Sequence, residues 1–222
     1  MTMPRRTTSR EWMDQLEQTL EAFDETGGRR VLTQVFDELG VEDALSHVVL
    51  PYLQEVGERW SAGSIGVGQE HFASNVLRSR LSVLMGTGER PEGPLALLAC
   101  MPGEQHEFGL MATSIVLSRL GWRTCYLGAD TPTSELSLTC RTLQPQAVVV
   151  AARRATAFAA HAPALRRVGR TTPVHLAAAG ATDDVARLCH ATRLDGDPVQ
   201  GARLLHENLG GSASDIDEFT AV

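Results

Sequence analysis

The sequence contains no Cys-x-x-Cys pair among its four cysteines, so neither a zinc site nor a disulfide framework is predicted. No apolar run approaches the ~20 residues that a membrane-spanning helix needs, and no secretory h-region opens the chain. A basic face is also lacking: the formal net charge is −7, and neutralising nucleic-acid phosphates needs clustered cations. These absences predict a cytoplasmic protein that binds neither a membrane nor nucleic acid directly.

The chain has 222 residues, 43% hydrophobic and 21% charged, which is enough to bury the core of one large or two small domains. Apolar side chains recur at helical spacing through the first 88 residues and predict four helices joined by short loops. The Gly27-Gly28 pair is expected to end the first helix, after an apolar series that runs to Phe23. Pro51 lies inside the third helix and is expected to kink or split it. Four antiparallel helices with short connections make a small bundle.

A linker rich in glycine, proline and charge covers residues 86–94, and the pattern changes after it. Short continuous apolar runs, typical of strands buried on both faces, cover residues 95–100, 124–127, 147–151 and 174–178. Helical stretches separate and follow them, at residues 109–120, 134–143, 158–168, 183–190 and 198–209. This alternation predicts βαβ units and a parallel sheet. The predicted architecture is an N-terminal four-helix bundle (residues 8–88), an α/β flavodoxin-like, Rossmann-type domain (residues 94–210) and a flexible tail (residues 211–222).

The loop after the first predicted strand contains His106 between two acidic residues. In an open α/β sheet, ligands bind beyond the carboxyl ends of the strands, where the strand order reverses, and this loop borders that point. The carboxylate of Glu104 can hold one ring nitrogen of His106 and leave the other for a metal, while Gly109 opens the next helix. From spacing alone, a surface histidine beside Glu104 and Glu107 is the simpler explanation.

The same loop resembles the Asp-x-His-x-x-Gly signature of base-off/His-on cobalamin domains, with Glu104 in place of the usual aspartate. The resemblance implies that His106 replaces the cofactor's own benzimidazole as the lower ligand of cobalt, and that the nucleotide tail lies beside the sheet. The family's serine after the third strand falls at Ala151, which provides no hydroxyl for that tail. The cofactor contacts implied in this domain are Glu104, His106, Gly109, Gly128, Ala151 and Gly180.

A second set of residues lies near the end of the third predicted helix and the start of the fourth. Trp60, Val67 and the pair Glu70-His71 resemble the helical cap of the CarH/LitR-type light-dependent cobalamin regulators. In that family these positions enclose the adenosyl group above the cobalt, which implies adenosylcobalamin as the cofactor. An indole stacks on a purine or its sugar, and a carboxylate accepts hydrogen bonds from ribose hydroxyls. Taken singly, Trp60 is better explained as a core residue and Glu70-His71 as a solvated helix face.

Two departures from that family bear on the output. The family's DNA-binding winged helix precedes the cap, whereas the few dozen residues before the cap here predict one amphipathic helix, so direct DNA binding is not expected. The residue after the tryptophan is often a histidine that captures cobalt after illumination, and here it is Ser61. Related photocobilins recruit a bilin such as biliverdin as second chromophore, which fits the missing histidine, although no residue here specifies a bilin site.

The sequence therefore predicts a cobalamin-binding light sensor without enzymatic activity, whose output passes through self-association or a partner protein. The alternative is a corrinoid carrier subunit of a methyltransferase with the same two-part architecture. The set at Trp60, Glu70 and His71 favours an adenosyl group over a methyl group. A flavodoxin-like phosphoacceptor needs an aspartate at the end of the third strand, and residues 151–153 provide none.

Overall fold

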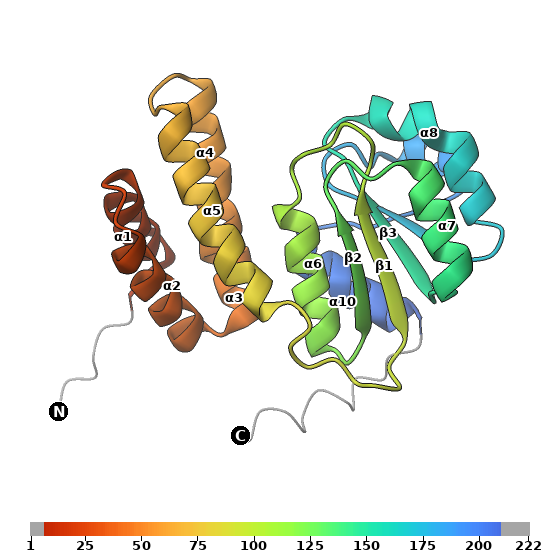
Figure 1. Cartoon of the computed structure of the whole chain (residues 1–222), viewed down its shortest axis with the longest axis horizontal. Coiled ribbons are helices and arrows are strands. Elements are labelled where there is room, and N and C mark those ends of the chain that lie inside the picture. The colour runs from red at the N-terminus through yellow and green to blue at the C-terminus, as the bar shows by residue number, and fades with distance from the viewer. Residues whose placement is uncertain (1–6, 210–222) are drawn as a thin grey trace. The chain divides into compact units, whose positions relative to one another are not determined.

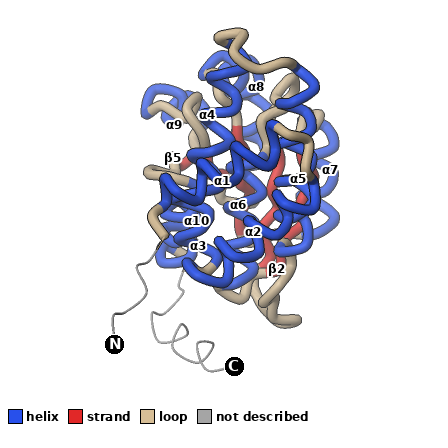
Figure 2. Tube along the Cα trace, turned by 90° about the vertical axis from the view of Figure 1, so that its left-hand side faces the viewer, coloured by secondary structure: helices blue, strands red, loops and turns tan. Residues whose placement is uncertain are grey.

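The computed structural model describes residues 7–209 and divides into two compact units, with the boundary between Val83 and Leu84. The predicted tail, residues 211–222, lies outside the described residues. Helices make up the first unit, and within residues 7–209 every strand belongs to the second (Figure 1; Figure 2). No helix in this part of the chain is long and apolar enough to cross a bilayer.

The first unit begins with a well-capped helix. The hydroxyl of Thr8 accepts the Glu11 N–H, and the Glu11 carboxylate accepts the Thr8 N–H, so this capping box starts the helix at Ser9. Tertiary contacts join α1 to α2 and to η1, and Arg80 of α5 lies over the ring of Phe36 of α2. The elements are α1 (Ser9–Glu21), α2 (Glu25–Leu39), α3 (Val41–Ala44), the π-helix η1 (Leu45–Val49), α4 (Leu50–Ser61) and α5 (Val67–Leu84).

The prediction that Gly27-Gly28 ends the first helix is wrong. Both glycines lie in the first turn of α2, where the Asp24 side chain accepts the Gly27 N–H and caps the helix. A Cβ on Gly28 would lie 2.6 Å from Cδ2 of the buried Leu20, so this glycine permits the close approach of α1 and α2. The apolar series also ends earlier than expected, because Phe23 has a φ of 56° and is 54% exposed.

The third helix, expected to be kinked or split at Pro51, continues through the proline with a π-helical turn before it. Pro51 lies in the first turn of α4, directly after the π-helical turn η1. Proline has no N–H to donate to the carbonyl four residues earlier, and its ring needs room beside that carbonyl. A wider π turn before the proline supplies that room.

The second unit contains a five-stranded parallel sheet with the order β2-β1-β3-β4-β5. This order is the flavodoxin-like one, so the predicted α/β class is confirmed. The strands are β1 (Leu95–Cys100), β2 (Arg123–Gly128), β3 (Ala147–Ala151), β4 (Val174–Ala177) and β5 (Thr192–Arg193). β5 was not expected, because two exposed polar residues make no apolar run.

Helices cover both faces of this sheet (Figure 1). On one face α6 (Phe108–Arg119) packs against α10 (Pro198–Asn208). On the other, α7 (Thr133–Leu143), α8 (Ala155–Val168) and α9 (Asp183–Cys189) share a core with alternate residues of β1, β3 and β4. The strand order reverses between β1 and β3, so the loops at residues 101–107 and 152–154 flank the switch point, as predicted for the His106 loop.

The four cysteines are free thiols that pack within the second unit. Cys100, Cys140 and Cys189 are buried, and Cys125 is half-buried. Burial, together with the nearby Glu104 carboxylate, raises the pKa of the Cys100 thiol to about 12. Burial also raises the pKa of the other three thiols. They therefore behave as small core residues, as their apolar surroundings in the sequence predict.

Candidate functional site

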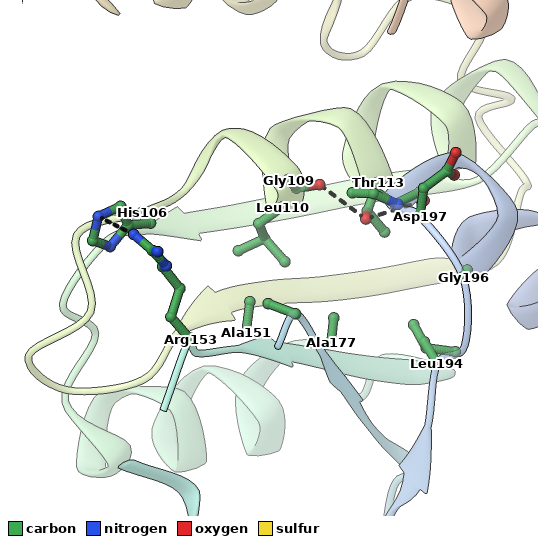
Figure 3. A pocket seen from close by; sticks show the side chains of 13 residues that line it. His106, Gly109, Leu110, Thr113, Ala151, Arg153, Ala177, Leu194, Gly196 and Asp197 are labelled. Atoms are coloured by element: carbon green, nitrogen blue, oxygen red, sulfur yellow. Dashed lines mark hydrogen bonds between the residues drawn. The ribbon is translucent and has the colours of Figure 1, made fainter. Parts of the chain in front are cut away.

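A cavity of about 220 Å³ opens at the carboxyl ends of β3 and β4, on the side of the sheet that α6 and α10 cover (Figure 3). Small residues make the space: Ala151 and Ala177 end the two strands, and Gly109 and Gly201 contribute from the two helices. Figure 3 shows His106 at one end of the cavity and Asp197 at the other. The cavity is therefore a mostly apolar space with an imidazole at one end.

Glu104 fixes the His106 loop. Its carboxylate is buried, and one oxygen accepts both the backbone N–H of His106, at 2.9 Å, and the His106 ring nitrogen Nδ1, at 2.6 Å. The other oxygen accepts the backbone N–H of Arg153, at 2.7 Å, from the loop after β3. One carboxylate thus ties together the two loops that flank the switch point and orients the imidazole between them.

The second ring nitrogen of His106 is also engaged. The Arg153 guanidinium lies 3.0 Å from Nε2 (Figure 3). Because a guanidinium only donates hydrogen bonds, Nε2 is the accepting nitrogen and Nδ1 carries the proton that it donates to Glu104. This tautomer leaves the Nε2 lone pair directed away from the carboxylate, which is the form in which a histidine ligates a metal.

The ionisation of Glu104 reflects two opposing effects. Burial would raise the pKa of this carboxyl group, but the backbone N–H groups of Arg153 and His106, with the His106 ring, stabilise the carboxylate more. The net result is a pKa below the ordinary value. Glu104 therefore remains an ionised acceptor at neutral pH, able to hold the proton on Nδ1 of His106.

The residues predicted in the second unit differ in their distance from the cavity. His106, Gly109 and Ala151 line it. Gly180 is not a lining residue; a Cβ there would lie 2.6 Å from the Arg154 carbonyl carbon, so it allows close packing against the loop after β3. Gly128 does not line the cavity either, and its φ of 81° makes the turn after β2.

The residues predicted in the first unit gather at one end of the helix pair α4 and α5, on either side of the turn at residues 62–66. Trp60 is 50% exposed and Val67 is 55% exposed, so neither is a core residue. The Glu70 carboxylate accepts the Ser74 hydroxyl at 2.8 Å and lies 3.5 Å from Nε2 of the exposed His71 ring. An indole and a valine left open beside a fixed carboxylate make a surface suited to a ligand with both apolar and polar parts.

Sequence reasoning missed one wall of the cavity and one contact. Leu194, Gly196 and Pro198 line the cavity from the segment that leads into α10. A signal for that turn exists, because Asp197 caps α10 by accepting the Gln200 N–H and Pro198 occupies the first helical position. The Arg153 contact has no such signal, because it depends on the side-chain conformation of a loop arginine.

Among residues 7–209, no cluster of three or more His, Cys, Asp or Glu side chains could hold a bare metal ion. The imidazole of His106 therefore stands without a cluster of further metal-ligating side chains around it. A metal that the protein holds through a single imidazole must receive its other ligands from elsewhere. In a corrinoid the macrocycle supplies them, and the cavity beside His106 offers room for a group attached to that macrocycle. The site thus fits a corrinoid better than a free metal ion.

Comparison with known proteins gives a family match in the first unit, outside the His106 cavity. The family described as B12 binding domain matches residues 12–85, which cover the helices of the first unit. The HTH-type transcriptional repressor CarH of Myxococcus xanthus is 33% identical over 174 residues, which cover 77% of this chain and 58% of CarH. The first unit is thus similar to a B12 binding domain. The chain is homologous to CarH and to the repressor CarA of the same organism, which is 40% identical over 129 residues, 58% of this chain and 43% of CarA.

The matched region spans little more than half of CarH and less than half of CarA. Among solved structures, the monomethylamine corrinoid protein of Methanosarcina barkeri superposes on the chain with a TM-score of 0.73 at 15% sequence identity, covering 90% of this chain and all of that one. At that identity the likeness concerns the fold alone. The chain thus has regulators as sequence relatives and a corrinoid protein as a structural neighbour.

Proposed function

We propose that this chain is a regulatory module that holds cobalamin in the base-off form, with Nε2 of His106 as the lower axial ligand of cobalt. The observation that carries the proposal is the Glu104–His106 pair, because the buried carboxylate fixes the tautomer in which Nε2 carries the lone pair that a metal needs. The cavity lined by Ala151 and Ala177 is the proposed place for the nucleotide tail. Small side chains there support this role even though Ala151 lacks the hydroxyl of related domains.

For the upper face, we propose that Trp60, Val67, Glu70 and His71 contact an adenosyl group. The exposure of Trp60 and Val67 supports this role, since burying them against a ligand removes apolar surface from water. Residues 8–88 are then a helical-bundle cap and residues 94–210 the domain that carries His106. When bound, adenosylcobalamin supplies a cobalt–carbon bond that visible light breaks.

The proposed output is a change in association with a second copy or a partner protein, because the upper-face residues lose their ligand on illumination. Such a change requires only that the adenosyl group favours one arrangement of the chain over another. CarH and CarA are HTH-type transcriptional repressors, and only a regulatory use of cobalamin is carried to this chain. Bilin binding remains a prediction of the family resemblance, and no described residue adds support to it.

A second candidate function is a corrinoid carrier, and the fold of the monomethylamine corrinoid protein favours it. The two candidates differ in the upper group they require. A carrier must accept a methyl group and open to a partner enzyme, whereas a light-responsive regulator must prefer an adenosyl group. Comparing affinity for adenosylcobalamin and methylcobalamin, and recording the absorption spectrum before and after green light, separates them.

The lower-ligand proposal is tested with His106→Ala, loaded with hydroxocobalamin and compared with the unmodified chain. We expect the unmodified protein to show a histidine-ligated, base-off spectrum, and the variant to show a base-on spectrum or to lose the cofactor. His161→Ala is the matched control, because His161 lies on α8 and does not line the cavity. An unchanged base-off spectrum in His106→Ala would disprove the proposal.

A further inference from the structure

The nitrogen of His106 that a metal needs is the one that Arg153 contacts. Nε2 has one lone pair in the plane of the ring, and the Arg153 guanidinium donates to it at 3.0 Å (Figure 3). A lone pair cannot accept this hydrogen bond and bind cobalt at once. Any metal that binds Nε2 must therefore first displace the Arg153 side chain.

Hydrogen bonds to Glu104 hold together the two loops that carry Arg153 and His106. The Arg153 N–H donates to one oxygen of Glu104 while the His106 ring donates to the other. Both partners are thus anchored to the same carboxylate, which keeps the guanidinium within reach of the imidazole. Both side chains are nevertheless exposed, so the guanidinium can leave for water at little cost.

We infer that Arg153 is a competing residue that occupies the metal-binding nitrogen of His106 and sets the affinity of the site for the incoming corrinoid. The inference rests on the proposed function, since it takes His106 as the lower ligand. When only a fraction of the molecules has Nε2 available, the apparent affinity for the corrinoid is the intrinsic affinity multiplied by that fraction. Arg153 therefore lowers both the association rate and the affinity by competing for Nε2.

The first test uses the protein without cofactor. Diethyl pyrocarbonate modifies an imidazole through its unprotonated nitrogen, so its reaction with His106, followed by mass spectrometry of the peptide, reports how free Nε2 is. We expect Arg153→Leu to raise the modification rate about fivefold, the scale of one net hydrogen bond. Arg154→Leu is the matched control: it removes the same charge from the neighbouring exposed residue, which does not line the cavity.

The second test measures binding of hydroxocobalamin and of aquacobinamide, which lacks the nucleotide tail. Arg153→Leu keeps the backbone N–H that Glu104 accepts, so the loop should fold as before, which circular dichroism checks. We expect both corrinoids to bind about fivefold more tightly to Arg153→Leu, and with unchanged affinity to Arg154→Leu. A gain for both corrinoids supports competition at Nε2.

Weaker binding of hydroxocobalamin alone would instead make Arg153 a contact of the tail and overturn the inference. Equal modification rates in the unmodified chain and Arg153→Leu would overturn it as well, whatever the corrinoids do. The proposed function fails separately, through an unchanged base-off spectrum in His106→Ala. The two conclusions therefore stand or fall on different measurements.

Discussion

Glu104 accepts hydrogen bonds from the backbone of both loops at the switch point, through one oxygen to residue 106 and through the other to residue 153. Related domains carry an aspartate at this position, and a glutamate has one more methylene with which to reach the second loop. The carboxylate is ionised despite its burial because these N–H groups compensate it. At the scale of single residues, the proposed lower-ligand site is thus organised by one buried charge that the backbone stabilises.

His175 on β4 is a further buried titratable group of this unit. Neither of its ring nitrogens has a hydrogen-bond partner among the described residues, and burial lowers its pKa. The folded chain therefore binds a proton less readily than the unfolded chain. Stability is full above the unfolded pKa of about 6.5 and falls as the pH drops from there toward the lowered folded pKa.

We predict that His175→Leu makes the free energy of unfolding depend less on pH as the pH falls below neutrality. Chemical denaturation at a series of pH values should show the unmodified chain losing more stability than the variant between pH 7 and pH 5. At pH 8 the two should differ by about 1 kcal/mol or less, since the volume is nearly conserved. His47→Gln, at an exposed position, should keep the slope of the unmodified chain. Parallel profiles for His175→Leu and the unmodified chain would contradict the prediction.

At the scale of elements, the packing of α1 on α2 depends on the absence of a side chain at Gly28. We predict that Gly28→Ala destabilises the first unit by about 1 kcal/mol, because the added Cβ would lie 2.6 Å from the buried Leu20 side chain. The gain in helix propensity, about 1 kcal/mol, offsets only part of the overpacking. Urea denaturation followed by circular dichroism measures the difference.

Gly57 provides a control for which we expect alanine to change the stability in the opposite direction. It also lies inside a helix, α4, but a Cβ there meets nothing within 4 Å. Gly57→Ala should therefore stabilise the chain by about 0.5–1 kcal/mol through helix propensity alone. If Gly28→Ala were stabilising to the same degree, close helix packing would not be the reason for this glycine.

The comparison of these two glycines explains what the sequence could and could not predict. The strands β1 to β4 and the helices between them follow from periodicity and apolar runs, because burial on two faces leaves a local pattern. The role of Gly28 depends on Leu20, which reaches it only after the chain has folded. β5 has no pattern of its own, since pairing with β4 defines it. Glu104 and His106 form a recognisable motif, whereas the Arg153 contact is a matter of side-chain conformation.

At the scale of the whole molecule, the proposed recognition of the upper group makes the affinity of the chain depend on which cobalamin it is offered. We predict that Trp60→Ala and Glu70→Gln each weaken adenosylcobalamin binding by about 1–3 kcal/mol, the scale of a lost stack or charged hydrogen bond. Hydroxocobalamin, which has no adenosyl group, should bind with nearly unchanged affinity. Calorimetric titration of both cofactors measures the difference.

Val83→Ala is the control for general effects on the helical unit, because Val83 is 65% exposed near the other end of α5. It should leave both affinities unchanged. Equal losses for both cofactors in Trp60→Ala or Glu70→Gln would mean that these residues support the first unit rather than contact the adenosyl group.

The four thiols of the second unit have a practical consequence for observing such a change. Because their pKa values are raised, they react slowly with maleimide dyes at neutral pH. A cysteine introduced at each of two exposed positions, such as Thr33 and Arg141, would therefore be labelled ahead of the natural ones. Energy transfer between two such dyes would then follow the separation of the two units in single molecules, in the dark and under illumination, with every natural cysteine left in place.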